Sequence, residues 1–157
     1  MIEVNGYPTR DQVKERFPTD LIKPKAIIEC YQEIPCNPCE TSCPFDAITI
    51  GRDINKRPVI DFDKCTGCGV CVYSCPGLAI MVANVKDDLA YYKIPYELLP
   101  LPKKGEIWQG INRKGKKICS ATILNVIKNK STDRTAVIHV SVPKKYLYDF
   151  ITIRSPK

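Results

Sequence analysis

The sequence predicts an α+β fold in which a small cysteine-rich domain is followed by a small antiparallel β domain with the form of a compact barrel. The first observation behind this prediction is an internal repeat, which appears when the chain is compared with itself at an offset of 32 residues. The second is a series of strand-like runs in the C-terminal half, with turn residues between them. The N-terminal half is therefore organised by a repeated cysteine motif, and the C-terminal half by successive β-strands.

Charge and cysteine content change in the same region of the chain. Residues 1–83 hold nine Lys or Arg and eleven Asp or Glu, whereas residues 84–157 hold fifteen and six, so the net charges are −2 and +9. Eight of the nine cysteines also lie in the first part. We therefore expect an N-terminal arm over 1–24, a cysteine-rich domain over 25–84 and a basic β domain over 90–157.

The overall composition is that of a globular protein. Hydrophobic residues make up 44% of the 157 residues and charged residues 26%, which excludes a wholly disordered chain. The longest apolar run, over 78–83, is far shorter than the ~20 residues that a membrane-spanning helix needs. The first residues contain no secretory signal. We expect a cytoplasmic protein without a membrane span.

In the arm, Thr9 is the expected N-cap of a short helix over 10–17. Each copy of the repeat then predicts a strand, a cysteine loop, one helical turn and a returning strand. The first strand is expected over 25–29, and a hairpin is expected from residues 47–51 and 57–62. The two copies imply a pseudo-twofold arrangement.

The C-terminal half predicts an antiparallel sheet. Strand-like runs cover 106–111, 117–127 and 135–142, with turn signals over 112–115 and 130–133. Residues 143–149 are expected to form a helical turn, because proline suits the first helical position, and 151–153 a closing strand.

The repeated motif carries the chemistry. In it, Cys36, Cys39 and Cys43-Pro44 align with Cys68, Cys71 and Cys75-Pro76. The second copy is complete as Cys65-x2-Cys68-x2-Cys71-x3-Cys75-Pro76, the spacing with which one loop wraps a cubane iron–sulfur cluster and sends its fourth thiolate to a second cluster. Zinc sites typically use two separated ligand pairs, often with histidines, and this chain has a single histidine. Gly67 and Gly69 suit a loop that closes around a compact cluster.

Residues 25–83 resemble the bacterial two-cluster ferredoxin family, through this motif and its incomplete first copy. The resemblance implies a ferredoxin-like two-cluster domain with crossed ligation. One 4Fe-4S cluster would be held by Cys65, Cys68, Cys71 and Cys43, and the other by Cys36, Cys39, Cys75 and Cys30.

The first copy departs from the family pattern, because Glu33 occupies the position where a cysteine is expected. Cys30 is the expected replacement. Two alternatives remain open: Cys30 is a buried structural thiol and the first site holds a 3Fe-4S cluster, or Glu33 supplies an oxygen ligand, although iron–sulfide centres favour thiolates.

Cys119 and His139 are not expected to take part in cluster binding. Cys119 lies far from both motifs and is expected to be a structural thiol. His139 alternates with apolar neighbours and is expected at a surface or interface. No nucleophilic triad or phosphate loop is present, so no catalytic residue is assigned and catalysis is expected on another chain.

Two clusters without a substrate site predict an electron-transfer subunit. The string over 29–39 resembles small ferredoxin-type subunits of flavin-dependent amino-acid dehydrogenases of the proline or hydroxyproline kind. That resemblance implies a flavoprotein dehydrogenase partner in a hetero-oligomeric complex, from which single electrons pass through these clusters to an acceptor.

The basic β half is expected to dock the partner, because interface cores are enriched in aromatic residues and arginine. The aromatic residues concerned are Tyr91, Tyr92, Tyr96, Trp108, Tyr146 and Tyr148. The alternative is an iron–sulfur protein with a nucleic-acid-binding or regulatory role, suggested by the basic run over 113–117. Against nucleic acid, the aromatic residues are not interleaved with these charges as in a stacking platform.

Overall fold

The structure is a computed structural model that describes residues 5–156. Its main element is a seven-stranded sheet in the order β1-β4-β5-β8-β7-β6-β9, and every neighbouring pair is antiparallel. The strands are β1 (Lys25–Ile28), β4 (Ile80–Lys86), β5 (Leu89–Tyr96), β6 (Ile107–Asn112), β7 (Lys117–Ile127), β8 (Ala136–Pro143) and β9 (Phe150–Arg154). The large antiparallel sheet and the few short helices confirm the α+β class.

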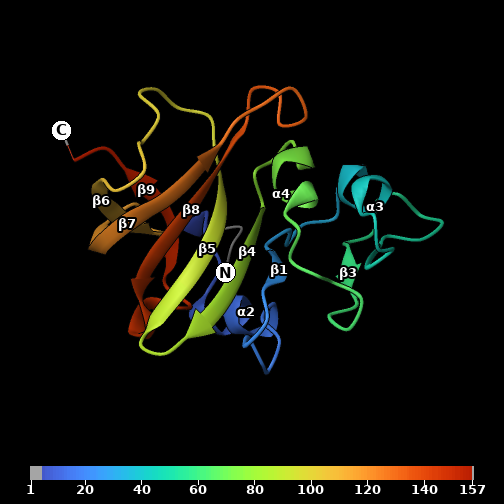
Figure 1. The fold of residues 1–157 in the computed structure, drawn as a ribbon. Coiled ribbons are helices and arrows are strands. Elements are labelled where there is room, and N and C mark those ends of the chain that lie inside the picture. Colours follow the sequence, from blue (N-terminus) through green and yellow to red (C-terminus); the bar gives the residue numbers. More distant parts are fainter. Residues whose placement is uncertain (1–4, 157) are drawn as a thin grey trace.

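The cysteine-rich unit lies at one side of this sheet, as Figure 1 shows. It contains α3 (Pro38–Ser42), β2 (Ile48–Thr49), β3 (Val59–Ile60) and α4 (Val70–Ser74). The expected hairpin is present, since β2 and β3 pair with Ile48 opposite Ile60. With β1 before the first cysteine loop and β4 after the second, both repeats have the predicted order of strand, loop, helical turn and strand.

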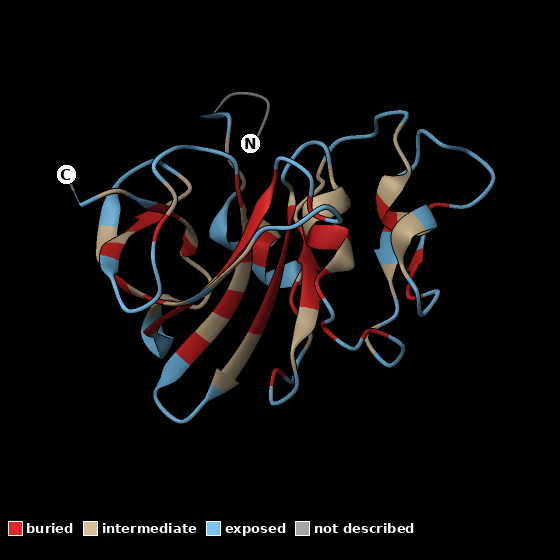
Figure 2. Ribbon diagram, turned by 45° about the horizontal axis from the view of Figure 1, so that its top comes forward, coloured by how far each residue is buried: buried red, intermediate tan, exposed pale blue. Residues whose placement is uncertain are grey.

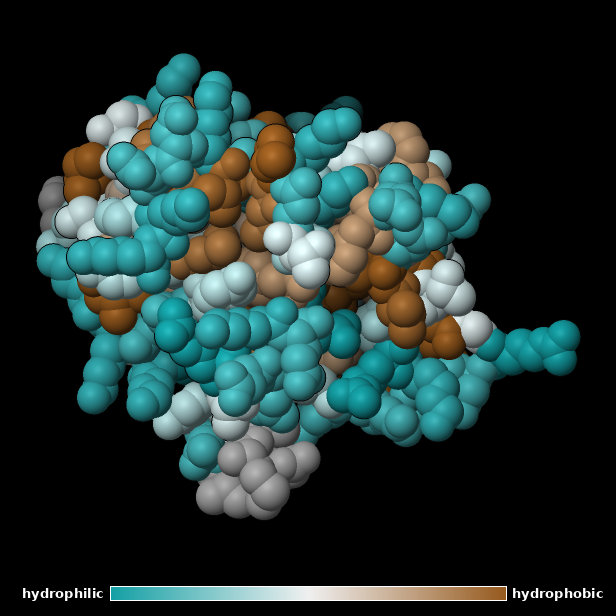
Figure 3. Space-filling model, turned by 90° about the horizontal axis from the view of Figure 1, so that it is seen from below, coloured by the Kyte–Doolittle hydropathy of each residue, from teal (hydrophilic) through white to brown (hydrophobic). Residues whose placement is uncertain are grey.

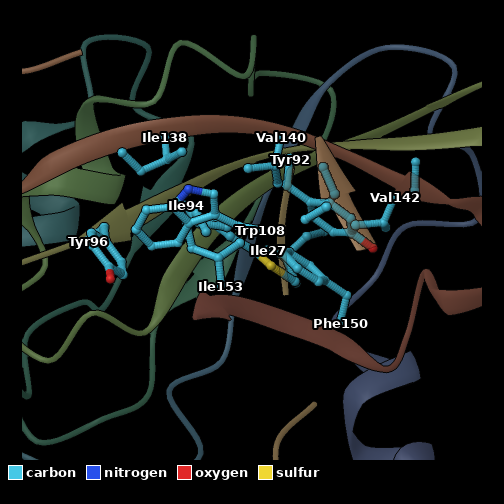
Figure 4. Close-up of a cluster of buried hydrophobic side chains, with 14 of the residues drawn as sticks. Ile27, Tyr92, Ile94, Tyr96, Trp108, Ile138, Val140, Val142, Phe150 and Ile153 are labelled. Atoms are coloured by element: carbon cyan, nitrogen blue, oxygen red, sulfur yellow. The ribbon is translucent and has the colours of Figure 1, made fainter. Parts of the chain in front are cut away.

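The sheet separates two hydrophobic clusters. The inner face encloses the larger one, in which Tyr92, Trp108 and Phe150 lie among aliphatic side chains (Figure 4). The outer face, through Ala26 and Val82, packs against Val72 of α4 and the neighbouring cysteines. The red segments in Figure 2 follow the strands between these clusters. One face of the sheet thus supports the β half, and the other supports the cysteine loops.

The arm folds back onto its own chain. Helix α2 (Arg10–Glu15) has a capping box, in which the Thr9 hydroxyl accepts from Gln12 N–H and the Gln12 side chain accepts from Thr9 N–H. Val13 and Phe17 are buried in the inner cluster. The predicted N-cap is therefore confirmed, and the arm completes the core beneath the sheet.

The expected boundary near 84–90 falls in the hairpin between β4 and β5. The sheet continues across it, because Val82 pairs with Lys93 and Lys93 pairs with His139. Val137 of β8 also belongs to the cluster around the cysteines. The two expected domains therefore share one sheet and are not separate layers.

Strand β5 has no counterpart among the sequence predictions, although its residues alternate between buried and half-buried positions. Pro95 argues against a strand there, because proline cannot donate a ladder hydrogen bond. The structure resolves the conflict: pairing of β5 with β4 reaches only to Lys93, so Pro95 has a neighbouring strand on one side alone.

The predicted C-terminal strands are confirmed within a residue or two. The helical turn expected over 143–149 is shorter, because η1 covers only Lys144–Tyr146 and Pro143 ends β8. The sheet curls, but among residues 5–156 β1 and β9 do not pair, so the expected barrel stays open. A groove lined by Met81, Ile151 and Thr152 lies between β4 and β9.

Three of the aromatic residues that were expected to dock a partner are buried in the core. Tyr92, Tyr96 and Trp108 are 2%, 6% and 4% exposed, so they belong to the core and not to a docking face. The face in Figure 3 is mostly hydrophilic, with hydrophobic patches between the hydrophilic side chains. Within residues 5–156 no helix has the length and apolar character needed to cross a membrane.

Candidate metal centre

Four thiols from both repeats meet beside α4. Burial raises the pKa of Cys71 to about 12, and negative charge on Cys65, Cys68 and Cys43 adds to the rise. Charge acts on a pKa mainly over short distances, so these three thiols lie near Cys71. We call Cys43, Cys65, Cys68 and Cys71 the second thiol group. All four line one small cavity, together with Gly67 and Gly69.

A second gathering lies beside α3. Burial raises the pKa of Cys39 to about 11, and charge on Cys75, Cys36 and Cys30 contributes in the same direction. The pKa of Cys30 is also raised by burial and by Cys75 and Cys36. We call Cys30, Cys36, Cys39 and Cys75 the first thiol group. Each group contains three cysteines of one repeat and one of the other.

The chemistry of these donors fits iron–sulfur ligation. Metal binding deprotonates coordinating thiols, and four thiolates without imidazole are the usual donor set of a 4Fe-4S cluster. Within residues 5–156 no three or more His, Cys, Asp or Glu side chains are arranged to hold a single metal ion. A cubane attaches its four ligands to four different irons, so it needs a wider spacing than one ion does.

Backbone N–H groups point at the sulfurs in a repeated pattern. Ala47 N–H donates to Cys43 Sγ over 3.4 Å, and Ala79 N–H donates to Cys75 Sγ over 3.4 Å. These two contacts correspond to each other under the offset of the repeat. Ala26 N–H on β1 donates to Cys65 Sγ over 3.2 Å. Hydrogen bonds to sulfur are one of the means by which a protein tunes a cluster's reduction potential.

The loop of the second thiol group depends on a glycine. Gly67 has a φ of +72°, and a Cβ there would lie 2.7 Å from the Pro24 carbonyl oxygen. The end of the arm therefore lies directly against this loop. Gly69 also has a positive φ, +86°, and forms the N-cap of α4. Both glycines predicted to suit the loop occupy conformations that favour glycine.

The longer loop of the first thiol group brings Cys30 among its partners. Glu33, by contrast, pairs with Lys56 at 3.6 Å and its side chain is 55% exposed. Two arginines hold backbone carbonyls near Cys30: Arg16 donates to Ile28 O over 2.6 Å and Arg57 to Tyr31 O over 3.4 Å. Both arginines act to lower the pKa of Cys30, against the effect of burial.

Sequence reasoning missed an ion pair next to this loop. Arg113 donates to both oxygens of Glu29, over 2.7 and 2.9 Å, and to Tyr148 O over 2.6 Å. The Tyr31 hydroxyl donates to Glu29 over 3.0 Å. Burial and the Glu29 charge raise the pKa of Tyr31. In the sequence Arg113 is simply the first residue of a basic run, and no local pattern indicates its distant partner.

The two remaining candidates lie away from the thiol groups. Cys119 on β7 is half-buried, packs against the inner cluster and approaches Gly110, as expected of a structural thiol. His139 is half-buried and opposite Lys93. Burial and the Lys93 charge lower the pKa of His139.

Comparisons with known proteins agree with this chemistry. Residues 34–79 match the protein family described as 4Fe-4S dicluster domain. The ferredoxin-type protein NapF of Haemophilus influenzae is 37% identical over 86 residues, which cover 52% of this chain and 46% of that protein. ABC transporter E family member 1 of Arabidopsis thaliana is 32% identical over 124 residues, which cover 71% of this chain and 19% of that protein.

A third relative belongs to the Na(+)-translocating ferredoxin:NAD(+) oxidoreductase complex of Acetobacterium woodii, of which it is one subunit. It is 55% identical over 38 residues, which cover 24% of this chain and 11% of that protein. The chain spans less than half the length of each of these curated relatives. No solved structure gives a significant match. The cysteine-rich part of this chain is thus similar to 4Fe-4S dicluster domains and to ferredoxin-type proteins.

Proposed function

We propose that the chain binds two 4Fe-4S clusters, one on each thiol group. Cys43, Cys65, Cys68 and Cys71 hold one cluster, and Cys30, Cys36, Cys39 and Cys75 hold the other. The observation that carries this assignment is the crossed composition of the two groups: Cys43 lines one cavity with Cys65, Cys68 and Cys71, and Cys75 acts on the pKa values of Cys30 and Cys39. Cys30 completes the first group in place of Glu33, whose carboxylate is paired with Lys56.

The function that this arrangement supports best is electron transfer as a subunit of an oxidoreductase complex. When bound, an iron–sulfur cluster accepts and releases one electron at a time. The residues around the thiols determine how far the sulfurs are shielded from water and where a partner can approach. Cys39, Cys65 and Cys71 are at most 9% exposed, and Val72 and Ile48 pack beside them, which keeps water from the sulfurs. Cys68 is exposed, so the second thiol group offers the route to a partner.

The proposed partner is a flavin-containing dehydrogenase that delivers electrons to the clusters, in a hetero-oligomeric complex. Two observations support it: the resemblance of the string over 29–39 to subunits of amino-acid dehydrogenases, and the relative that is part of an oxidoreductase complex. Catalysis then takes place on the partner chain. The localisation proposed for such a complex is cytoplasmic.

The nucleic-acid alternative receives no support from the basic run. Arg113, its first cation, is engaged with Glu29 and Tyr148 and is 10% exposed. Of the remaining lysines of the run, Lys114 and Lys116 lie in the turn between β6 and β7, and Lys117 begins β7. The aromatic residues Tyr92, Tyr96 and Trp108 are buried and provide no platform for stacking bases.

Anaerobic affinity purification of the tagged full chain from its own cells tests the proposal. We expect a flavoprotein to co-purify, to be identified by mass spectrometry and flavin absorbance, and to reduce the clusters when its substrate is added. Salt-dependent co-purification of DNA or RNA without any flavoprotein would contradict the proposal. A Cys65→Ser chain is the control, because it should retain the partner but accept electrons poorly.

A further inference from the structure

A lysine of the β half reaches into the cysteine loop. The Lys93 ammonium donates to Gly67 O over 2.9 Å, and its aliphatic chain lies 3.6 Å from the position that a Cβ on Gly69 would take. Gly67 directly precedes Cys68, the exposed thiol of the second group. Lys93 therefore contacts the buried Gly67 and approaches the buried Gly69, the two residues that flank the exposed Cys68.

The same loop is held on its other side. Lys25, at the start of β1, donates to Phe62 O over 2.5 Å and to Cys65 O over 2.7 Å. Pro24 closes against Gly67 so tightly that no side chain fits between them. Lys25 and Pro24 belong to the segment that enters the cysteine-rich unit, whereas Lys93 comes from β5.

Sheet geometry determines where Lys93 lies. Ala26, Val82, Lys93 and His139 form one row across β1, β4, β5 and β8. Ala26 and Val82 are buried against the cysteine-rich unit, and Lys93 continues this row at its border. Lys93 has no carboxylate within ion-pair distance in the part of the chain that the structure describes. Its charge is thus balanced by no acid and faces the loop.

We propose that Lys93 is a positioning residue for the cluster held by Cys43, Cys65, Cys68 and Cys71, and that its charge raises the reduction potential of that cluster alone. This inference rests on the proposed function. Reduction adds a negative charge to the cluster, and a nearby ammonium stabilises the more negative state. The hydrogen bond to Gly67 O keeps the ammonium at that position and limits the movement of the Cys68 segment. Through Lys93, the sheet of the β half raises the reduction potential of one cluster and leaves that of the other unchanged.

The test compares full-length chains that lose one positive charge at different places. In Lys93→Met the charge and the hydrogen bond to Gly67 are both lost. Lys86 and Lys93 both line a surface groove beside Tyr91 and His139. In Lys86→Met this exposed lysine is lost, and it has no hydrogen bond or ion pair to the loop. Redox titration followed by paramagnetic resonance gives the two midpoint potentials. The Cys65→Ser and Cys30→Ser chains assign each signal to its thiol group.

For Lys93→Met we expect unchanged iron content, a more negative midpoint and altered g-values for the cluster that Cys65→Ser damages, and no change in the other. Lys86→Met should leave both midpoints unchanged, and Lys93→Arg should restore the shifted one toward its original value. Equal midpoints in Lys93→Met and Lys86→Met, or a shift of the other cluster, would overturn the inference.

If Lys93→Met does not fold, Lys93→Gln replaces it, with the same negative shift expected and the same absence of a shift as contradiction. An unmutated chain that carries no iron–sulfur cluster would overturn the proposed function itself. That result is distinguishable from two intact clusters whose potentials do not depend on Lys93.

Discussion

Glu29 and Arg113 form a bidentate ion pair that joins the end of β1 to the turn between β6 and β7. Their side chains are 8% and 10% exposed, and the closest nitrogen–oxygen distance is 2.7 Å. Glu29 directly precedes Cys30 in the chain, so the pair fixes the point where the first cysteine loop begins. It also connects two regions of the sheet that no hydrogen-bonded strand pairing brings together among the described residues.

Removal of one partner of this pair should destabilise the protein strongly. Arg113→Met leaves the Glu29 carboxylate buried with only the Tyr31 hydroxyl, and such changes typically cost about 3–5 kcal/mol. Denaturant unfolding of the full chain measures the loss. Arg10→Met is the control, because the Arg10–Asp149 pair is 56% and 39% exposed and an exposed pair is worth about 0–1 kcal/mol. Equal effects of the two substitutions would show that the buried pair has no special role.

A methyl group at Gly67 should prevent the second thiol group from forming its site. Gly67→Ala places a Cβ 2.7 Å from the Pro24 carbonyl oxygen in a backbone with positive φ. We expect the chain to lose about half of its iron. Gly115→Ala is the control that separates backbone strain at positive φ from the steric clash of the Cβ. Gly115 has a φ of +83° but open space around its Cβ position. Full iron content in Gly67→Ala would mean that the arm and the loop move apart easily.

Cys30→Ser should selectively damage the cluster that we propose on the first thiol group. Cys30 lies among Cys36, Cys39 and Cys75, so its loss leaves that cluster with three thiolates. Iron analysis and paramagnetic resonance should show one altered signal and one intact signal. Cys119→Ser and Glu33→Gln are the controls and should change neither. If Cys30→Ser is silent and Glu33→Gln is not, the carboxylate is the ligand.

His139 should make the stability of the protein fall at mildly acidic pH. Its pKa in the folded chain is lowered, first by burial and then by Lys93, so the unfolded chain binds the proton more readily. The contribution is complete above the unfolded value of about 6.5 and is lost as the pH falls through it toward the folded pKa. Denaturant unfolding at pH 7.5 and 5.5 measures the effect. The drop should be smaller in His139→Gln, and an identical drop in both chains would assign the effect to other groups.

Local patterns predicted the repeats, the hairpin and most C-terminal strands, because cysteine spacing, alternation and turn residues are signals within a short segment. They failed where tertiary pairing decides. Pro95 conceals β5 unless the one-sided pairing of that strand is known. The aromatic residues could be core or interface by composition, and the curled sheet buries Tyr92 and Trp108.

The site was predicted to a similar extent. The spacing of the second motif and the resemblance to ferredoxins predicted both thiol groups, including the exchange of Cys43 and Cys75, and their role as cluster ligands stays a prediction. The hydrogen bonds of Lys25 and Lys93 to the loop, and the Glu29–Arg113 pair, join residues that are 26 to 84 positions apart. No periodicity in a single sequence encodes such contacts, since they depend on how the sheet brings β1, β5 and the β6–β7 turn together.

The proposed function requires each thiol group to hold one 4Fe-4S cluster. Iron and acid-labile sulfide analysis of the anaerobically purified full chain, with paramagnetic resonance of the reduced protein, tests this most directly. We predict about eight irons and about eight sulfides per chain, with charge-transfer absorbance and signals from two interacting clusters. Stoichiometric zinc without charge-transfer absorbance would contradict the assignment.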